Sequence, residues 1–355
     1  MIGIDLFSGA GGMSLGALQA GIDVRLAIEF DPHATATYTY NHSTTRIIQA
    51  DIRCLNEIDI DKAGQCTILF GGPPCQGFST SNQRTRKRDN PTNWLFLEFL
   101  RVTQLWKPNW VVFENVTGLK ETAGGVFLEQ LLNSLKYIGY TTTWWILNAS
   151  DFGVPQRRSR LFVVASLDGM VVSEPKATCT RHVTVREAIT DLPDLPNGAS
   201  ENILPYKSKA PYQYAKAMRK KLKKTANHLV TRNAPYVIHR YKHIPQGGNW
   251  QDIPRKLMRN YADYSQCHTG IYHRLDENEP SVVIGNYRKN MLIHPTQDRG
   301  LSVREAARLQ SFPDWYEFRG SIGFQQQQVG NAVPPMLAQA VFEAIVTASG
   351  EKRAH

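Results

Sequence analysis

Short apolar runs alternate with helical patterns through the first half of the sequence. Apolar runs of strand length predict strands at residues 2–7, 24–29, 47–51, 67–70, 110–114, 141–147 and 160–166. Between them, helix-start signals and helical spacing predict helices, such as one that opens at Asp31-Pro32 and others over about 93–106 and 126–137. Continuous apolar strands that alternate with helices are typical of a parallel sheet with helices on both faces. We therefore expect an α/β fold built on a doubly wound, Rossmann-like, mostly parallel sheet.

The pattern changes after about residue 170. Pro, Tyr, Lys and Asn dominate up to about residue 300, and this stretch has no clear repeat and no strong period. Order returns near the C-terminus, where residues 303–310 predict a short helix and residues 336–346 carry apolar side chains at helical spacing. We interpret the chain as one discontinuous domain, residues 1–172 and 325–355, interrupted by a smaller and irregular domain at residues 173–324.

The positive charge of the chain is concentrated in one segment. Lys and Arg number 41 against 31 Asp and Glu, which gives a formal net charge of +10. Residues 201–260 hold 14 of the cations and only two acids, Glu201 and Asp252, so this segment carries +12 and the rest of the chain −2. A basic segment of this kind indicates an anionic polymer as partner.

Composition also excludes several classes of protein. Hydrophobic residues make up 42% of the chain, enough for a sizeable core, which argues against general disorder. No apolar run approaches the ~18 residues of a membrane span, so we expect no membrane partner. The five cysteines are odd in number and form no CxxC pair, which argues against a metal site or a disulfide framework and favours a reducing cytoplasm.

Three strand ends offer groups suited to a nucleoside cofactor. The first strand runs into a glycine-rich turn, Ser8 to Gly12, where the backbone can approach a ligand closely. Glu29 ends the second strand, where an acid can hold ribose hydroxyls, and Asp51 ends the third, where it could reach an adenine amino group. These positions leave a nicotinamide dinucleotide and S-adenosylmethionine as open alternatives.

Cys75 is the candidate nucleophile. It lies in Gly-Gly-Pro-Pro-Cys at the end of the fourth strand, where a thiolate on a stiff loop could attack an electrophilic carbon. Glu114 ends the next strand, and enclosure there would favour the neutral form of its carboxyl, which could then donate a proton. Arg158 and Arg160 share one face if their segment is extended, and they could converge on one substrate. A solvated basic edge is the alternative interpretation of these two arginines.

Together these residues resemble a known family, the DNA (cytosine-5)-methyltransferases of the prokaryotic type found in restriction-modification systems. The matching blocks are DLFSGAGG at 5–12, Glu29, Asp51, GGPPCQGFS at 71–79, ENV at 114–116, QRRSR at 156–160, REAARLQSFP at 304–313 and GNAVPP at 330–335. They stand in the family's order over almost the whole chain. The first block lies close to residue 1, which argues against the eukaryotic maintenance type.

The resemblance implies a class I methyltransferase fold with S-adenosyl-L-methionine as methyl donor and S-adenosyl-L-homocysteine as product. It implies that the cofactor is surrounded by Phe7, Gly9, Gly11, Glu29, Phe30, Asp51, Ile52, Pro74, Leu95 and Asn331. Residues 1–172 and 325–355 would form the catalytic domain, and residues 173–324 the target-recognition domain that binds DNA.

The reaction that the resemblance implies is methyl transfer to carbon 5 of a cytosine flipped out of duplex DNA. Cys75 would add to carbon 6, Glu114 would hydrogen-bond or protonate ring nitrogen 3, and Arg160, with Arg158, would lie near the cytosine carbonyl. A mobile loop would contact DNA and close over the flipped base through Ser79, Gln83, Arg84 and Arg86. We expect a nucleoid-associated monomer in the cytoplasm of a bacterium or archaeon, and a cognate restriction endonuclease that acts separately.

Three alternatives stay open at this point. An RNA cytosine-5 methyltransferase would use the same scaffold, although the large basic insertion favours duplex DNA. A non-catalytic DNA-binding regulator would keep the fold without the chemistry, but Cys75, Glu114 and Arg160 are all present. A nicotinamide-dependent oxidoreductase would explain the glycine turn and Glu29, yet it gives no role to the proline-cysteine block.

Overall fold

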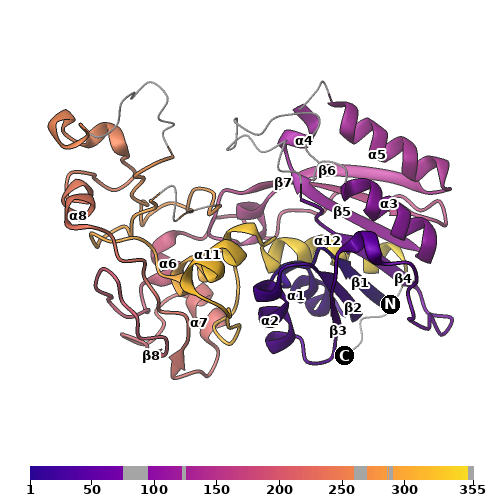
Figure 1. Cartoon of the computed structure of the whole chain (residues 1–355), viewed down its shortest axis with the longest axis horizontal. Coiled ribbons are helices and arrows are strands. Elements are labelled where there is room, and N and C mark those ends of the chain that lie inside the picture. Colours follow the sequence, from indigo (N-terminus) through magenta and orange to yellow (C-terminus); the bar gives the residue numbers. More distant parts are fainter. Residues whose placement is uncertain (75–94, 122–124, 260–269, 286, 288–290, 351–355) are drawn as a thin grey trace. The chain divides into compact units, whose positions relative to one another are not determined.

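The computed structural model of the chain describes residues 1–74, 95–121, 125–259, 270–285, 287 and 291–350 (Figure 1). The chain divides into two compact units. Unit 1 comprises Met1–Phe152, Ser159–Thr178 and Val333–His355, and unit 2 comprises Gly153–Arg158 and Cys179–Ala332. Unit 1 is therefore discontinuous. The composition of the sequence placed the divisions at residues 172 and 324, and it did not indicate that Gly153–Arg158 belongs with unit 2.

Unit 1 is built on a seven-stranded sheet with the strand order β3-β2-β1-β4-β5-β7-β6. Its strands are β1 (Ile2–Leu6), β2 (Asp23–Glu29), β3 (Arg46–Gln49), β4 (Thr67–Gly71), β5 (Trp110–Val116), β6 (Thr141–Asn148) and β7 (Ser159–Ser166). Neighbouring strands pair in parallel, except that β7 pairs antiparallel with both β5 and β6. The expectation of a doubly wound, mostly parallel sheet is confirmed, and each predicted strand lies close to its predicted bounds.

The strand order reverses beside β1. The chain continues from β1 to β2 and β3 on one side, and then returns to β4 on the other side of β1. Open α/β sheets bind ligands at such a reversal, outside the carboxyl ends of the strands. The loops that follow β1, β2, β4 and β5 are therefore placed to build a site.

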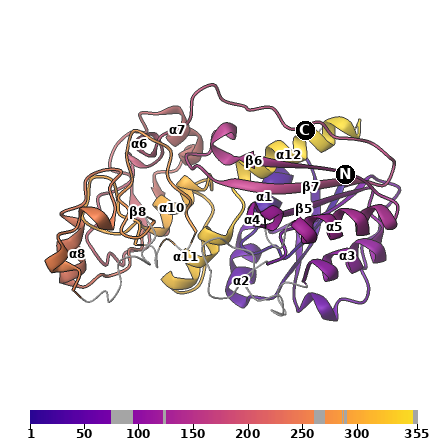
Figure 2. The same cartoon turned by 90° about the horizontal axis from the view of Figure 1, so that it is seen from above.

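Helices cover both faces of this sheet (Figure 2). The helices of unit 1 are α1 (Gly12–Gln19), α2 (Pro32–Asn41), α3 (Leu95–Trp106), α4 (Gly118–Glu121), α5 (Val126–Tyr137) and α12 (Pro335–Ala348), with short 3-10 turns at Ile52–Cys54 and Ala149–Phe152. Side chains alternate along β4, so its neighbouring residues serve opposite faces. Leu69 joins the core formed with α3 and α5, whereas Phe70 meets Phe342 of α12 with ring centroids 4.9 Å apart.

The C-terminal helix α12 completes unit 1 by packing on α1. A Cβ at Gly16 would lie 2.6 Å from the Cβ of Ala338, so the close approach of the two helices requires glycine there. By length and composition alone, the helical stretch Ile322–Ala348 could cross a membrane. However, 61% of its most apolar 18-residue segment is buried inside the protein. That burial is typical of a core helix. The helix predicted over residues 336–346 is confirmed.

Unit 2 consists of short elements joined by long loops. Its helices are α6 (Val185–Ile189), α7 (Gln213–Arg219), α8 (Pro235–Tyr241), α10 (Val303–Leu309) and α11 (Ile322–Asn331), with 3-10 turns at Trp250–Asp252 and Arg255–Leu257. Two short strands, β8 (Leu204–Pro205) and β9 (Lys224–Thr225), pair antiparallel. The helix α10 was predicted, and α6, α7, α8 and α11 were not. Helices of one or two turns leave little period in the sequence.

Buried ion pairs surround α10 in the core of unit 2. Arg308 is fully buried, and its guanidinium nitrogens lie 2.5 Å from Asp191 Oδ1 and 2.6 Å from Asp314 Oδ2. Glu305 pairs with Arg299 at 2.7 Å. Burial raises the pKa of Glu305, but Arg299 and its other partners outweigh burial and lower it to about 2. The charged residues of the REAARLQ block therefore hold unit 2 together.

Candidate active site

Glu114 lies near the carboxyl end of β5 and is paired with Arg160 of β7. The two residues are diagonal neighbours on antiparallel strands, because Glu114 opposes Phe162 and Arg160 opposes Val116. Arg160 Nε lies 3.0 Å from Glu114 Oε1, and the two side chains are only 12% and 10% exposed. Burial lowers the pKa of Arg160, and the Glu114 carboxylate opposes this effect without cancelling it. A buried carboxylate and guanidinium thus meet at this edge of the sheet.

The segment that leads to Cys75 is held directly against this pair. Gly72 follows β4, and a Cβ at Gly72 would lie only 2.6 Å from Glu114 Oε2. The side-chain amide of Asn115 donates a hydrogen bond to the carbonyl oxygen of Pro73, at 3.0 Å. Two residues of the Gly-Gly-Pro-Pro-Cys block are therefore fixed on the Glu-Asn pair of β5.

The predicted nucleophile and the predicted DNA-contacting loop lie outside the described residues. They are Cys75, Ser79, Gln83, Arg84 and Arg86. The described part of the block ends at Pro74, which is exposed after the buried Pro73. The roles of the five residues stay predictions.

Glu29 holds the glycine turn that follows β1. The amide of Gly9 donates to Glu29 Oε2 at 2.7 Å, and the amides of Phe30 and Asp31 donate to Oε1 at 2.9 and 2.8 Å. Burial raises the pKa of Glu29, although these three amides oppose the shift. A carboxylate offers about four acceptor positions, so Glu29 keeps the capacity to accept one more hydrogen bond from a ligand hydroxyl.

The turn itself is tightly curved and open on its outer side. Phe7, Gly9 and Gly11 have φ angles of 58°, 54° and 88°, a region that glycine enters freely and that strains Phe7. Among the described residues, no atom lies within 4 Å of where a Cβ of Gly9 would stand. The backbone of Gly9 can therefore approach a ligand closely.

Asp51 follows β3 and is engaged by its neighbour Arg53. The Arg53 guanidinium donates to both carboxylate oxygens, with a closest distance of 2.5 Å, and the Arg53 amide donates to Oδ1. These contacts lower the pKa of Asp51 to about 2. Because the Arg53 side chain is 66% exposed, water competes for this ion pair and a ligand could replace it.

Two more predicted cofactor residues of unit 1 follow strand ends, and a third begins α3. Phe30 is 70% exposed directly after Glu29, an arrangement that leaves one aromatic ring free to stack on a planar ligand. Ile52 is buried at the start of the 3-10 turn after Asp51. Leu95 is the first residue of α3 and packs partly against the core.

Two predicted site residues belong to unit 2. Arg158 is almost fully buried, and its guanidinium donates to the carbonyl oxygens of Ile284, Gly330 and Ala332 at 3.0 to 3.2 Å. Asn331 is exposed at the end of α11. Arg158 and Arg160 thus contact different partners in different units, and the catalytic role of Arg158 and the cofactor role of Asn331 stay predictions.

Sequence reasoning missed the anchoring role of Gln156 and of Asn115. The side-chain nitrogen of Gln156 donates to the carbonyl oxygen of Leu309 and to Gln310 Oε1. Its side-chain oxygen accepts from the backbone amide of Ile284. Both residues stand in blocks that the sequence singles out, QRRSR and ENV. Their position in those blocks was a signal, but only the folded chain shows what they bind.

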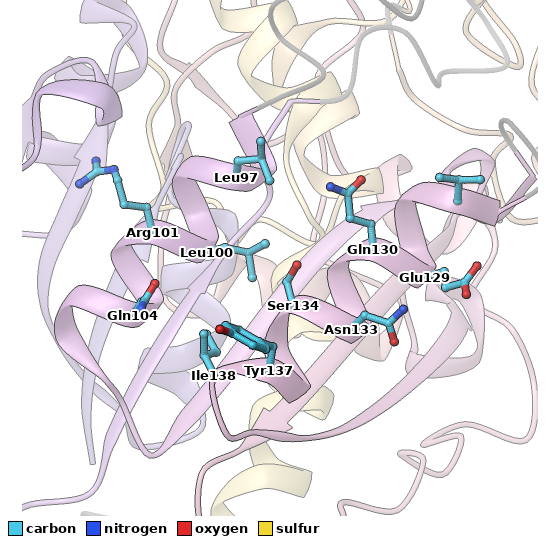
Figure 3. Close-up of a pocket in the computed structure, with 11 residues that line it drawn as sticks. Leu97, Leu100, Arg101, Gln104, Glu129, Gln130, Asn133, Ser134, Tyr137 and Ile138 are labelled. Carbon is cyan, nitrogen blue, oxygen red and sulfur yellow. The ribbon is translucent and has the colours of Figure 1, made fainter.

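A separate groove lies between α3 and α5 (Figure 3). Its volume is about 790 Å³, and it is lined by apolar residues such as Leu97, Leu100 and Ile138 and by polar residues such as Gln130 and Ser134. It contains none of the predicted site residues. The described residues also contain no group of three or more His, Cys, Asp and Glu side chains placed to hold a metal ion.

Comparison with known proteins points to one family. Residues 1–347 match the sequence model of the C-5 cytosine-specific DNA methylases. The chain is 37% identical to the Type II methyltransferase M1.HphI of Haemophilus parahaemolyticus, over 97% of this chain and 86% of that protein. It is 33% identical to the Type II methyltransferase M.DdeI of Desulfomicrobium norvegicum, over 96% of this chain and 88% of that protein.

A solved structure agrees with these sequence matches. It is described as a DNA modification methyltransferase encoded within an E. coli prophage, and it superposes with a TM-score of 0.80 at 26% identity, over 99% of this chain and all of that one. The RNA methyltransferase, the non-catalytic regulator and the oxidoreductase are not favoured beside these relatives. The chain belongs to the C-5 cytosine-specific DNA methylase family and is a DNA (cytosine-5)-methyltransferase of the restriction-modification type, with S-adenosylmethionine as the methyl donor that the family implies.

Proposed function

We propose that unit 1 is the catalytic domain and that its loops after β1, β2, β3, β4 and β5 form the reaction site. The observation that carries this proposal is the buried pair of Glu114 and Arg160. Gly72 packs against Glu114, and Pro73 accepts a hydrogen bond from the neighbouring Asn115. Cys75 follows these residues by two positions in the sequence. We therefore expect the Cys75 thiol to lie near the Glu114 carboxyl group, although the two residues are far apart in the sequence.

The residues at the strand ends fit S-adenosylmethionine. The spare acceptor capacity of Glu29 suits a ribose hydroxyl, the exposed ring of Phe30 suits an adenine face, and the open turn at Gly9 allows close approach of the methionine portion. Asp51 would exchange Arg53 for the adenine amino group. When bound there, the cofactor supplies the methyl group to the substrate, and S-adenosylhomocysteine remains.

The chemistry proposed for the protein side chains concerns the cytosine ring. The Cys75 thiolate forms a bond to carbon 6, which makes carbon 5 nucleophilic, while Glu114 in its protonated form donates a hydrogen bond or a proton at ring nitrogen 3. Arg160 holds the Glu114 carboxyl group in place through its Nε and lies ready to contact the ring carbonyl. After methyl transfer, loss of the carbon 5 proton breaks the bond to Cys75 and releases the product.

Unit 2 is proposed as the target-recognition domain, which binds duplex DNA. It contains the basic segment 201–260, and five lysines around the end of α7 and the start of β9 are exposed: Lys216, Lys220, Lys221, Lys223 and Lys224. Within the part of the chain that the structure describes, none of them forms a salt bridge. Uncompensated lysines suit phosphate contacts, which supply affinity without reading sequence.

The restriction-modification type of the relatives also suggests a cellular setting. The enzyme would act as a monomer on DNA in the cytoplasm, associated with the nucleoid, and a separate endonuclease would cut the same sequence when it is unmethylated. Light scattering of the purified protein would test the oligomeric state. A dimer that dissociates only with loss of activity would contradict the monomer.

Bisulfite sequencing of DNA from cells that express the chain tests the activity and identifies the cytosine that is modified. We expect conversion-resistant cytosines at one short recurrent sequence in cells with the wild-type chain. With Cys75→Ala we expect none, because the bond to carbon 6 cannot form, while binding to duplex DNA is retained. Full methylation by Cys75→Ala would overturn the mechanism, and label transferred only to tRNA would overturn the substrate.

A further inference from the structure

Helix α1 begins at the glycine turn without a side-chain cap of its own. Its N-cap residue is Gly11, which has no side chain to accept a hydrogen bond from the first turn. The carboxyl group of Asp5, on the neighbouring strand β1, accepts instead from the backbone amide and the hydroxyl of Ser14, the third residue of the helix. The distance from Ser14 Oγ to Asp5 Oδ2 is 2.6 Å. A strand residue thus caps the helix that carries the turn.

The hydrogen-bonded chain continues from Ser14 into α2. Ser14 Oγ lies 2.7 Å from the hydroxyl oxygen of Tyr38, and both side chains are completely buried. Tyr38 also hydrogen-bonds to Thr45, whose hydroxyl donates to the carbonyl oxygen of Val24 in β2. This hydrogen-bonded network therefore joins β1, α1, α2 and β2, the elements that flank the glycine turn and Glu29.

A second branch returns to the turn itself. The ring of His42 stacks on Tyr38, with ring centroids 4.3 Å apart, and His42 hydrogen-bonds to the backbone of Gly11. The carbonyl oxygen of Gly11 also accepts the amide of Leu15, the first hydrogen bond of the helix. Gly11, at the end of the turn, is thus held both by the helix and by the buried hydrogen-bonded network.

The titratable side chains of this hydrogen-bonded network, Asp5, Tyr38 and His42, are uncharged near neutral pH. Burial raises the pKa of Asp5 to about 8, against the opposing hydrogen bonds from Ser14 and with a further increase from Glu29. Burial lowers the pKa of His42 to about 4, and burial also raises the pKa of Tyr38. Asparagine has the shape of a protonated aspartic acid and the same carbonyl acceptor, so it is the natural substitute at position 5.

We propose that Asp5, Ser14, Tyr38 and His42 are positioning residues for the cofactor: they hold the glycine turn in the curvature at which its backbone meets S-adenosylmethionine. This inference rests on the proposed cofactor role of the turn. The four side chains are buried, so they act through Gly11 and the first turn of α1.

The test separates positioning of the cofactor from stability. Purified Asp5→Asn, Asp5→Ala and Ser14→Ala proteins are compared with the wild type for the KM of S-adenosylmethionine, for kcat at saturating cofactor and for the Kd of duplex DNA. We expect Asp5→Ala and Ser14→Ala to raise the KM of the cofactor roughly five- to tenfold, as loss of one or two hydrogen bonds predicts. We expect kcat and the Kd of DNA to stay within about twofold and Asp5→Asn to restore the wild-type KM.

Thr103→Ala is the matched control, because the Thr103 hydroxyl is equally buried and, among the described residues, donates to the carbonyl oxygen of Phe99 in its own helix α3. Its Tm should fall while the KM of the cofactor stays unchanged. If Ser14→Ala fails to fold, Tyr38→Phe removes only one hydroxyl and serves in its place. A KM that Ser14→Ala and Tyr38→Phe leave unchanged overturns the inference, and so does an Asp5→Asn protein as impaired as Asp5→Ala. Failure of the proposed function differs from both, because the wild-type protein would then not methylate DNA.

Discussion

Gly72 shows how one residue without a side chain can set the geometry of a reaction site. The Cβ that any other residue would add stands 2.6 Å from Glu114 Oε2, closer than real Cβ atoms approach an oxygen. Glu114 cannot retreat freely, since its other oxygen is held by Arg160 and both side chains are buried. The glycine before the proline-cysteine block therefore controls the position of the proposed acid.

Gly72→Ala should impair catalysis more than stability. The added methyl group would displace the Glu114 carboxyl group or the start of the Cys75 loop, and a displacement of ~1 Å at a reacting group costs about 100-fold in rate. We expect kcat of methyl transfer to fall on that order, with the KM of the cofactor nearly unchanged. Gly285→Ala is the control, because its Cβ would enter open space among the described residues. Equal activity of the two variants would show that Gly72 does not constrain the acid.

His228 is one of the buried histidines at which we expect acid sensitivity, beside His42 and His294. It is fully buried in unit 2, and neither ring nitrogen has a hydrogen-bond partner among the described residues. Burial, together with the charge of Arg304, lowers its pKa from 6.5 to about 4. Because the unfolded chain takes up the proton first, the stability that neutral His228 contributes is complete above pH 6.5 and is lost as the pH falls towards 4.

His228→Leu should remove this acid sensitivity. Urea unfolding at about pH 7.5 and about pH 4.5 would show the wild type losing on the order of 2 kcal/mol more free energy of unfolding than the variant. The exposed His239 provides the control, and His239→Leu should lose as much as the wild type. Parallel losses in the wild type and His228→Leu would contradict the assignment.

Among the elements, α10 combines buried charged side chains with buried apolar ones. Its N-terminus has a capping box of Ser302 and Glu305, and its C-terminal half carries Arg308 between two buried carboxylates. The helix is only seven residues long, too short to be stable by itself in water. Its partners in unit 2 therefore stabilise it.

Arg308→Met should strongly destabilise unit 2. Methionine is long enough to fill much of the space, but it leaves Asp191 and Asp314 buried without their cation. Breaking a buried pair in this way costs about 3–5 kcal/mol, so we expect a loss of that size in the free energy of unfolding measured with urea. Arg157→Met is the control, because its partner Glu279 is about half exposed and exposed pairs contribute roughly 0–1 kcal/mol. If Arg308→Met lost less than about 1 kcal/mol of free energy of unfolding, the buried ion pairs would not be what stabilises α10.

At the scale of the whole molecule, charge is divided between the two units. The segment with +12 lies in unit 2, and the remaining 295 of the 355 residues carry −2. On the proposed division of roles, a near-neutral catalytic unit and a strongly basic DNA-binding unit would separate DNA affinity from chemistry. Substitutions in the basic segment should therefore change binding before they change kcat.

Replacing three exposed lysines should reduce the salt dependence of DNA binding. Each phosphate contact contributes about 0.9 to the slope of log K against log salt concentration, so Lys220→Gln, Lys221→Gln and Lys223→Gln together should lower the slope by up to about 3. Fluorescence anisotropy with labelled duplex DNA measures this slope. The pair Lys107→Gln and Lys136→Gln in unit 1 is the control. An unchanged slope in the triple variant would exclude these lysines from the DNA contact.

Much of unit 1 could be predicted from the sequence because its signals are local. Strands buried on both faces appear in the sequence as apolar runs. Asp31-Pro32 predicted the start of a helix, and in the structure Asp31 caps α2 by accepting from the amides of His33 and Ala34. Unit 2 could not be predicted in this way. Its helices are short, and its core relies on ion pairs between residues far apart in the sequence, such as Asp191 and Arg308.

The sequence by itself determined the sheet, the basic segment, the family blocks and therefore the reaction, since each is a matter of residue type in order along the chain. Only the tertiary structure decided which of those residues meet. In the folded chain, Glu114 pairs with Arg160, and Arg158 donates hydrogen bonds to backbone carbonyl oxygens of unit 2. Asp5 accepts a hydrogen bond from Ser14 in the first turn of α1. Partners are set by distances across strands and helices, and composition and spacing along one chain do not contain those distances.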